Sequence, residues 1–378
     1  MLIGIDGNEA NIGKRVGVNV YAHELLKAIH KLQGEWKNKY RFLVYLKNIP
    51  LSDMPKESEN FKYKVLPAKG VWILTKFTPY ILLNPDKIDV FFSPSHYLPP
   101  ISRVPMVCSI MDLGYLRFSE QFRKYDYWQL KYWTAISINI SKRIIAISDS
   151  TRKDIVRQYP FASKKTVVVP LGYDKTHFST KISNEDVRRV KAKYHIVNNY
   201  ILFLSTLKPS KNVEGLLEAF SVISKRFSEF RLVIAGKKGW LYDSIFKKVK
   251  SLGLEKDVIF TDFVAEEDKP ALIKGAKVFV LPSFWEGFGL DVLNAIACGV
   301  PAVVSNIASL PEVVGSAGIL VDPYKPESIA SELNKVLLMA KKDYNILVEA
   351  GLSQANKFTW ESTARGILRV LESVSSKI

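Results

Sequence analysis

The amino-acid sequence predicts an α/β protein made of two doubly wound parallel-sheet domains that face one another across a cleft. Short apolar runs typical of strands alternate with segments of helical apolar spacing, and this alternation begins near residue 1 and restarts near residue 200. The 378 residues are too many for one ordinary core and suit two domains of about 150–200 residues each. An apolar content of 47% is enough for two such cores.

In the first half, the strands and helices follow one another as expected of a doubly wound sheet. Strands are predicted at residues 1–7, 41–46, 89–93, 106–111, 142–148 and 166–169, and helices at 18–32, 121–140 and 151–159. The apolar segment 70–83 is too short to span a membrane. It is either a core helix, which we favour, or a surface helix that faces lipid or an apolar acceptor.

The helix predicted at 121–140 is rich in aromatic residues, and most of these rings are expected in the core. It carries Tyr125, Tyr127, Trp128, Tyr132 and Trp133. Rings that remain exposed would combine with four nearby basic residues, namely Arg117, Arg123, Lys124 and Lys131. Such a surface suits an anionic membrane, which is therefore a candidate partner.

The second half repeats the pattern after a polar, charged segment at 176–199, where we place the domain boundary. The domains are predicted at 1–175 and 176–356, with the C-terminal helix in 357–378 packing back on the first domain. Strands are predicted at 200–205, 231–235, 258–261, 277–282 and 302–305, and helices at 213–224, 269–274, 290–298 and 360–374.

Composition excludes several functional classes. The net charge of +17 is spread along the chain without a basic block, and no nucleic-acid-binding motif is present, so nucleic acid is not an expected partner. Cys108 and Cys298 lie among apolar neighbours and are predicted to be buried thiols, not a disulfide or metal site. The N-terminus, with Asp6 and Glu9, lacks the layout of a signal peptide, which predicts cytoplasmic residence.

Two strand–loop–helix units are candidate anion sites. The stretch 283–301, SFWEGFGLDVLNAIACGVP, follows a strand and opens a helix through a glycine turn whose amides would face a phosphate, with Glu286 beside it for sugar hydroxyls. The loop ending at Gly17 opens the helix at 18–32 in the same way. Plain turn chemistry is the alternative for the first of these units. For the second, the alternative is an ordinary βα unit of a doubly wound sheet, which needs no ligand. His96 follows a strand at the edge where sites of parallel sheets lie.

Taken over almost its whole length, the chain resembles the retaining glycosyltransferases of family 4, which have the GT-B fold. The first half contributes IGIDGNEAN, GVNVYAHELLKAI, VFFSPSHYLPP, IMDLGYLRF, RIIAISDSTRKDI and VVVPLGY. The second half contributes LSTLKPSKNVEGLLEAF, LVIAGKKG, VIFTDFV, SFWEGFGLDVLNAIACGVPAVVS and LPEVVGSAGILVDP. The resemblance implies sugar transfer from a nucleotide-diphosphate sugar to a glycan or lipid-linked acceptor, with retained anomeric configuration, without metal or cofactor. The sequence contains no Asp-x-Asp motif.

Roles for individual residues also follow from the resemblance. Lys211 and Glu286 are the implied catalytic residues, on the diphosphate and the donor sugar respectively. Val264 would lie near the base and Asn294 at the ribose. The other donor-binding positions are Gly17, Ser210, Gly287, Phe288, Gly289 and Leu290, and the acceptor-side candidates are His96, Met111 and Asp112.

This sequence departs from the family pattern at five positions near the implied site. Ser210 stands where the family has Arg, Asn294 replaces the second Glu of the Glu-x7-Glu pair, and Met111 replaces a His. Asp262 and Asp291 replace a Gly and a Pro. The alternative to an active transferase is a catalytically impaired homologue that binds a glycan, a lipid or a partner protein. In either case we expect a cytoplasmic protein, with peripheral association at the inner face of the membrane as a candidate location.

Overall fold

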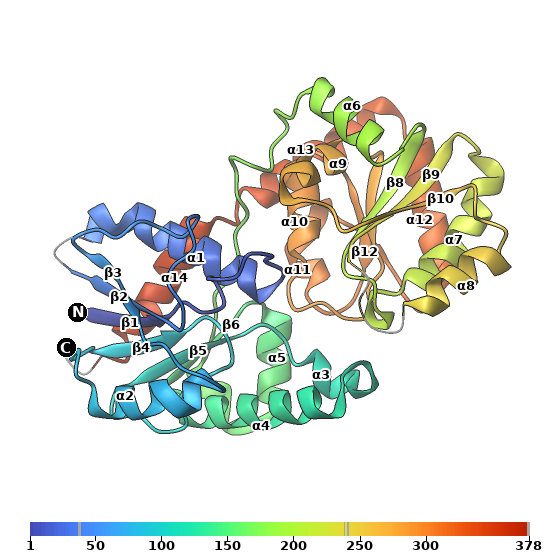
Figure 1. Ribbon diagram of the computed structural model, residues 1–378. Coiled ribbons are helices and arrows are strands. Elements are labelled where there is room, and N and C mark those ends of the chain that lie inside the picture. The colour runs from blue at the N-terminus through green and yellow to red at the C-terminus, as the bar shows by residue number, and fades with distance from the viewer. Residues whose placement is uncertain (37–38, 238, 240–241, 376–378) are drawn as a thin grey trace. The chain divides into compact units, whose positions relative to one another are not determined.

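The chain folds into two α/β units in a computed structural model that describes residues 1–36, 39–237, 239 and 242–375 (Figure 1). The first unit comprises Met1–Arg117, Arg123–Gly172 and Thr359–Ile378, and the second comprises Phe118–Phe122 and Tyr173–Phe358. The last three residues of the predicted C-terminal segment lie outside the described residues. Cys108 and Cys298 are buried free thiols, as predicted.

The first unit is built on a seven-stranded parallel sheet. Its strands are β1 (Leu2–Asp6), β2 (Arg41–Leu46), β3 (Phe61–Val65), β4 (Val90–Ser93), β5 (Met106–Ile110), β6 (Arg143–Ala146) and β7 (Thr166–Val168). Their order, β3-β2-β1-β4-β5-β6-β7, is that of a Rossmann-type sheet, and it reverses between β1 and β4. The edge strand β3 was not predicted, because its sequence FKYKV has two lysines and buries only Phe61 fully.

Helices flank this sheet, and the last helix of the chain is one of them. They are α1 (Val18–Leu32), α2 (Thr78–Leu83), α3 (Gly114–Arg117), α4 (Lys124–Ile140), α5 (Asp149–Gln158) and α14 (Trp360–Glu372). The bounds predicted for α1 are confirmed. Helix α14 packs on α1, where Lys31 pairs with Glu361 at 2.8 Å, and Thr363 donates a hydrogen bond to the Pro170 carbonyl at 2.7 Å.

The two aromatic segments of the first unit differ in their burial. Segment 70–83 forms a short π-helical turn, Ile73–Phe77, followed by α2, and Trp72 stacks on Phe77 in the core as favoured above. For α4 the core prediction was wrong, because none of its five rings is buried. Small residues, Thr134 and Ser137, form its buried face instead, together with Ile138.

The second unit repeats the topology with six parallel strands. They are β8 (Asn199–Leu204), β9 (Phe230–Ala235), β10 (Val258–Asp262), β11 (Val278–Leu281), β12 (Ala302–Ser305) and β13 (Ile319–Val321). In the order β10-β9-β8-β11-β12-β13 the direction of strand addition reverses between β8 and β11. The flanking helices are α6 (Asn184–Lys193), α7 (Val213–Arg226), α8 (Asp243–Ser251), α9 (Lys269–Lys274), α10 (Leu290–Ala297), α11 (Leu310–Val314), α12 (Pro326–Leu338) and α13 (Lys341–Ala355). Within the described residues, no helix is long and apolar enough to cross a membrane.

The polar segment 176–199 contains a helix that the sequence analysis did not predict. Helix α6 buries a single side chain, Val190, so its apolar pattern is weak. Ser183 caps its first turn by accepting a hydrogen bond from the Asp186 amide at 3.0 Å. The helix is tied to the unit through the buried carboxylate of Asp268, which accepts hydrogen bonds from Arg189, Lys193 and Tyr194.

We expect the substitution Asp268→Asn to lower the free energy of unfolding by about 1 kcal/mol at pH 7, since both basic partners are about half exposed to water. Although burial opposes ionisation, hydrogen bonds from Lys193, Arg189 and Tyr194 hold the pKa of Asp268 below its ordinary value. The stabilisation is therefore present at neutral pH and is lost as the pH falls below about 4. Chemical unfolding at pH 7 and pH 3.5 checks this, and equal differences at both would contradict it.

Candidate active site

Two loops meet where the strand order of the second sheet reverses, between β8 and β11. The loop after β8 carries Ser210 and Lys211, and the loop after β11 carries Glu286. The Lys211 ammonium pairs with Glu286 Oε1, and the two side chains are 11% and 12% exposed. The Phe284 amide donates a hydrogen bond to the Ser210 carbonyl at 2.9 Å, which joins the loops through their backbones. Carboxyl ends of parallel strands share one sheet edge, the usual place for ligands in such folds.

The turn that contains Glu286 is held on several sides. The Ser283 hydroxyl donates a hydrogen bond to Glu286 Oε1 at 3.0 Å. The Ser309 hydroxyl lies 2.9 Å from the carbonyl oxygens of both Glu286 and Phe288. The Phe288 ring is buried edge-on against Phe358, with 5.7 Å between ring centroids. Glu286 therefore has a fixed position before any ligand binds.

Helix α10 begins directly after this turn, at a glycine that its geometry requires. Gly289 has φ +102°, and a Cβ atom there would lie 2.6 Å from Leu310 Cδ2. No side chain within the described ranges caps the N-terminus of α10. The helix dipole places about half a positive charge at this end, so the amides near Gly289 and Leu290 favour an anion.

Two polar residues of the predicted site are buried. Ser210 is 4% exposed and Asn294, on α10, is 5% exposed. None of the described residues donates a hydrogen bond to the buried oxygen of the Asn294 amide. A buried hydrogen-bond acceptor that is left unsatisfied costs about 1–3 kcal/mol. A ligand hydroxyl that donated a hydrogen bond to this oxygen would therefore gain binding free energy.

Further charges surround the start of α10. Burial raises the pKa of Asp291, in the first turn of the helix, although the Lys269 ammonium opposes this. Burial disfavours the charged form of Lys269, but Asp291 and Glu266 outweigh it and raise the pKa of this lysine. Near the Lys211–Glu286 pair, the acidic side chains of Asp291 and Glu266 are thus accompanied by the basic side chain of Lys269.

The loop after β10 carries Val264, the residue implied for the base. Val264 is buried, and β10 lies two strands from β8, a separation of about 10 Å at usual strand spacing. Asp262, where the family pattern has Gly, has φ +54°, a left-handed conformation that glycine adopts most easily and aspartate tolerates. Aspartate at position 262 is therefore compatible with the conformation that this loop adopts.

The remaining predicted residues lie in the first unit. Gly17, at φ +51°, begins α1, and a Cβ atom there would meet nothing within 4 Å. His96 follows β4, where that sheet reverses; burial lowers its pKa to about 4, and no described residue bonds to its Nε2 atom. Met111 and Asp112 follow β5 and are half-buried; the Met111 carbonyl accepts a hydrogen bond from Thr151, and Asp112 accepts one from the Gly114 amide at 2.7 Å.

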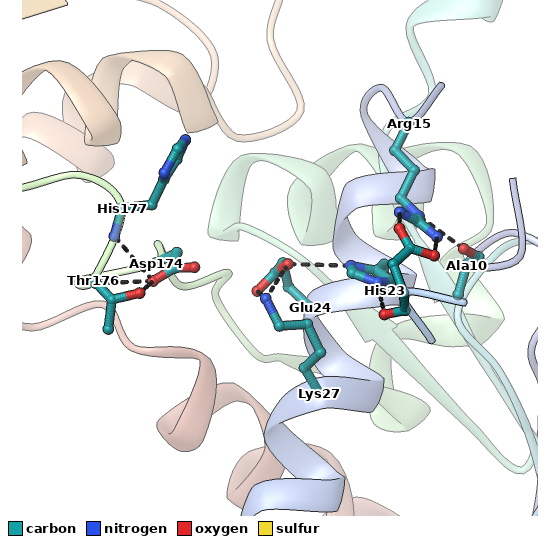
Figure 2. Close-up of polar contacts among 9 residues, drawn as sticks. Ala10, Arg15, His23, Glu24, Lys27, Asp174, Thr176 and His177 are labelled. Atoms are coloured by element: carbon teal, nitrogen blue, oxygen red, sulfur yellow. Dashed lines mark hydrogen bonds and ion pairs between the residues drawn. The ribbon is translucent and has the colours of Figure 1, made fainter. Parts of the chain in front are cut away.

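A carboxylate that was not predicted as a site residue lies at the end of β1. Asp6 is 5% exposed, and burial raises its pKa to about 6 although the Asn8 amide groups donate to it at 3.0 and 2.7 Å. Nearby, the Asn19 amide donates to Glu9 at 2.6 Å. Figure 2 shows Arg15 of the same loop donating to the Ala10 carbonyl. The available signal was an acidic residue at the end of a strand where the sheet reverses.

Two protein-family profiles match this sequence, one in each half of the chain. The profile described as "Glycosyltransferase Family 4" matches residues 16–177, and the one described as "Glycosyl transferases group 1" matches residues 185–354. The O-antigen chain mannosyltransferase B of Escherichia coli is 30% identical over 340 residues, which are 88% of this chain and 83% of that protein. The chain belongs to glycosyltransferase family 4. The serotype-specific mannosyltransferase WbdA of the same species is 32% identical over 237 residues, 61% of this chain but 29% of that longer protein.

Solved glycosyltransferase structures have the same fold as this family 4 member. HepE of Anabaena, solved with UDP and glucose, superposes with a TM-score of 0.73 at 19% identity, over 98% of this chain and 99% of that one. WaaG, a glycosyltransferase involved in lipopolysaccharide biosynthesis, superposes with a TM-score of 0.71 at 14% identity, over 98% and 99%. At these identities the likeness establishes the GT-B fold.

Proposed function

We propose that this glycosyltransferase moves a sugar, with mannose as the first candidate, from a nucleotide-diphosphate sugar to a glycan or lipid-linked glycan, with retention of anomeric configuration. The observation that carries the proposal is the pairing of Lys211 with Glu286 beside the start of α10. The names of the mannosyltransferase relatives support the sugar, and the UDP and glucose bound to HepE support the donor class.

In the proposed reaction the diphosphate leaves as negative charge builds on its oxygens. Lys211 and the amides of residues 287–290 would stabilise that charge, as fixed donors do in a site that excludes water. Lys211 exchanges Glu286 for a phosphate oxygen when the donor binds. This exchange frees the Glu286 carboxylate, held by Ser283 at 3.0 Å, to accept hydrogen bonds from the sugar hydroxyls.

The nucleotide would satisfy the buried oxygen of Asn294. A ribose hydroxyl is a neutral donor, so the amide at this position suits it without the charge of the usual glutamate. The contact replaces an unsatisfied acceptor with a hydrogen bond, and we expect nucleotide binding to depend on it. The base would lie over the loop at Val264.

The proposed chemistry uses neither a metal nor a cofactor. Lys211 and the helix amides would supply the positive charge that a divalent cation supplies in other transferases. Across the residues described, no group of three or more His, Cys, Asp or Glu side chains is arranged to hold a metal ion. We expect transfer to continue unchanged in excess EDTA; loss of activity that Mg²⁺ or Mn²⁺ restores would contradict this part of the proposal.

The first test measures the melting temperature with UDP, GDP, ADP and their sugar conjugates. A ligand at about 100 times its Kd stabilises the protein by roughly 2.7 kcal/mol, which raises the melting temperature by several degrees. We expect one nucleotide class to do so, and its sugar conjugate to support transfer to a glycan with retention, followed by NMR. Asn294→Leu should abolish the shift. Asn334→Leu, which changes an amide on α12 that pairs with Arg226, should leave it intact.

The outcomes separate an active transferase from an impaired homologue. A shift without transfer from any conjugate would favour the homologue that binds but does not react. If no nucleotide shifts the melting temperature, the donor site assigned to the second unit is wrong.

A further inference from the structure

Helix α4 exposes an unusually apolar face. Tyr125, Trp128, Tyr132 and Ile136 are 73%, 46%, 61% and 44% exposed. Their spacing of three, four and four residues places them on one face of the helix, opposite its buried residues. From Tyr125 to Ile136 this exposed stripe spans 12 residues, or about 16 Å of helix. In Figure 1, α4 forms the lower border of the first unit.

The rings of the exposed stripe are ordered by contacts within the helix. Trp128 stacks on Tyr132, with 5.3 Å between ring centroids and 17° between ring planes. The Lys131 ammonium lies 4.8 Å from the centroid of the Trp128 ring and 5.6 Å from that of Tyr127. Neighbours on α4 itself thus engage the Trp128 ring face, which a sugar would need for stacking. The exposed stripe therefore suits the apolar layer of a membrane surface better than a glycan.

Basic residues lie close to the exposed stripe in the sequence, and two of them border it on one side. Between residues 117 and 142 the chain has five basic residues and two acidic ones, a net charge of +3, in a protein of net charge +17. Lys124 and Lys131 border one side of the exposed stripe by helical position. A symmetric contact between two copies would place this positive patch against itself, which electrostatic repulsion opposes.

We propose that the exposed stripe of α4 docks the first unit on an anionic phospholipid surface. Trp and Tyr rings favour the boundary between headgroups and acyl chains, and lysines bind the acidic headgroups beside them. Each lysine near an anionic surface contributes about fivefold in binding. The proposal concerns where the protein binds and does not depend on the transfer reaction, so its test uses no donor or acceptor.

The experiment is co-sedimentation of the full chain with vesicles of phosphatidylcholine that contain 30% phosphatidylglycerol, and with pure phosphatidylcholine. We expect binding to the anionic vesicles to be at least about tenfold tighter, and to weaken in 0.5 M NaCl. Trp128→Ala with Tyr132→Ala should weaken it by about tenfold. Lys124→Ala with Lys131→Ala should weaken it by about 25-fold, from the fivefold effect of each lysine.

The same co-sedimentation experiment includes a control variant. The matched control removes two exposed apolar side chains of the second unit, Val222→Ser with Ile346→Ser, and should bind like the wild type. The melting temperature of each variant confirms that it folds. Wild-type protein that fails to bind, or an aromatic variant that binds equally well, would overturn the proposal. So would concentration-dependent dimers that the aromatic substitutions abolish, because a second copy would then occupy the exposed stripe.

Discussion

The substitution Lys211→Ala is expected to lower kcat for sugar transfer by about 10²–10³-fold, because it removes a fixed positive charge from the site where the diphosphate leaves. Glu286→Ala should also lower kcat, by removing the carboxylate proposed to hold the donor sugar. The measurement is initial-rate kinetics with the donor identified by the melting experiment. A kcat within threefold of wild type for Lys211→Ala would contradict the role given to this lysine.

The same pair predicts a pattern in stability that activity alone would not reveal. Each single substitution leaves one charge without its partner in a site where both side chains are nearly nine-tenths covered. We expect each to destabilise the second unit by about 2 kcal/mol, less than for a fully buried pair. The double substitution should cost about as much as one single substitution, without restoring activity. Additive losses would show that the two charges do not depend on each other.

The matched control is a second Lys–Glu pair in the same unit. Lys248 on α8 pairs with Glu218 on α7, and the two side chains are 30% and 41% exposed. Because water screens this pair, Lys248→Ala should cost less than about 1 kcal/mol and leave kcat unchanged. The comparison separates the effect of removing a lysine from the effect of removing this particular lysine.

Strong periodic patterns allowed much of the fold to be predicted. The bounds of α1 and α9 were predicted to the residue. Helix α1 has apolar residues at helical spacing, and α9 has a proline in its first turn and an apolar run bounded by lysines. The edge strands β3 and β13 were missed because a short edge strand is covered incompletely and shows little alternation. In α4 the aromatic residues were assigned to the core by type. Burial instead depends on which helix face the sheet covers, and that is a property of the tertiary structure.

In the candidate site, too, local features were predicted from the sequence and contacts between distant residues were not. The strand, glycine turn and helix around Gly289 are local, and they were predicted from the 25 consecutive residues 277–301. The contact between Lys211 and Glu286 joins positions 75 residues apart and depends on the order of β8 and β11 in the sheet. The left-handed backbone of Asp262 is likewise set by its loop. Residue types suggested the chemistry, and strand order decided which of them meet.

Asp6 illustrates a property that sequence alone does not provide, and it leads to the second major prediction. Burial raises its pKa from an ordinary 3.8 to about 6 in the native protein. The native state therefore binds a proton more tightly than the unfolded chain, so Asp6 costs stability as the pH rises from about 4 to 7. A shift of about two pKa units corresponds to about 3 kcal/mol.

We therefore expect the stability of Asp6→Asn, relative to wild type, to rise by about 3 kcal/mol between pH 4 and pH 7 and to level off above. Urea unfolding of both proteins across this range gives the difference directly, and contributions of other carboxylates cancel in it. Asp268→Asn is the control, since its difference from wild type develops below about pH 4 and should change little between pH 4 and pH 7. A difference for Asp6→Asn that is constant with pH would mean that this carboxyl titrates as it does in the unfolded chain. A rising difference would show that the protein keeps a destabilising carboxylate at the carboxyl edge of its first sheet.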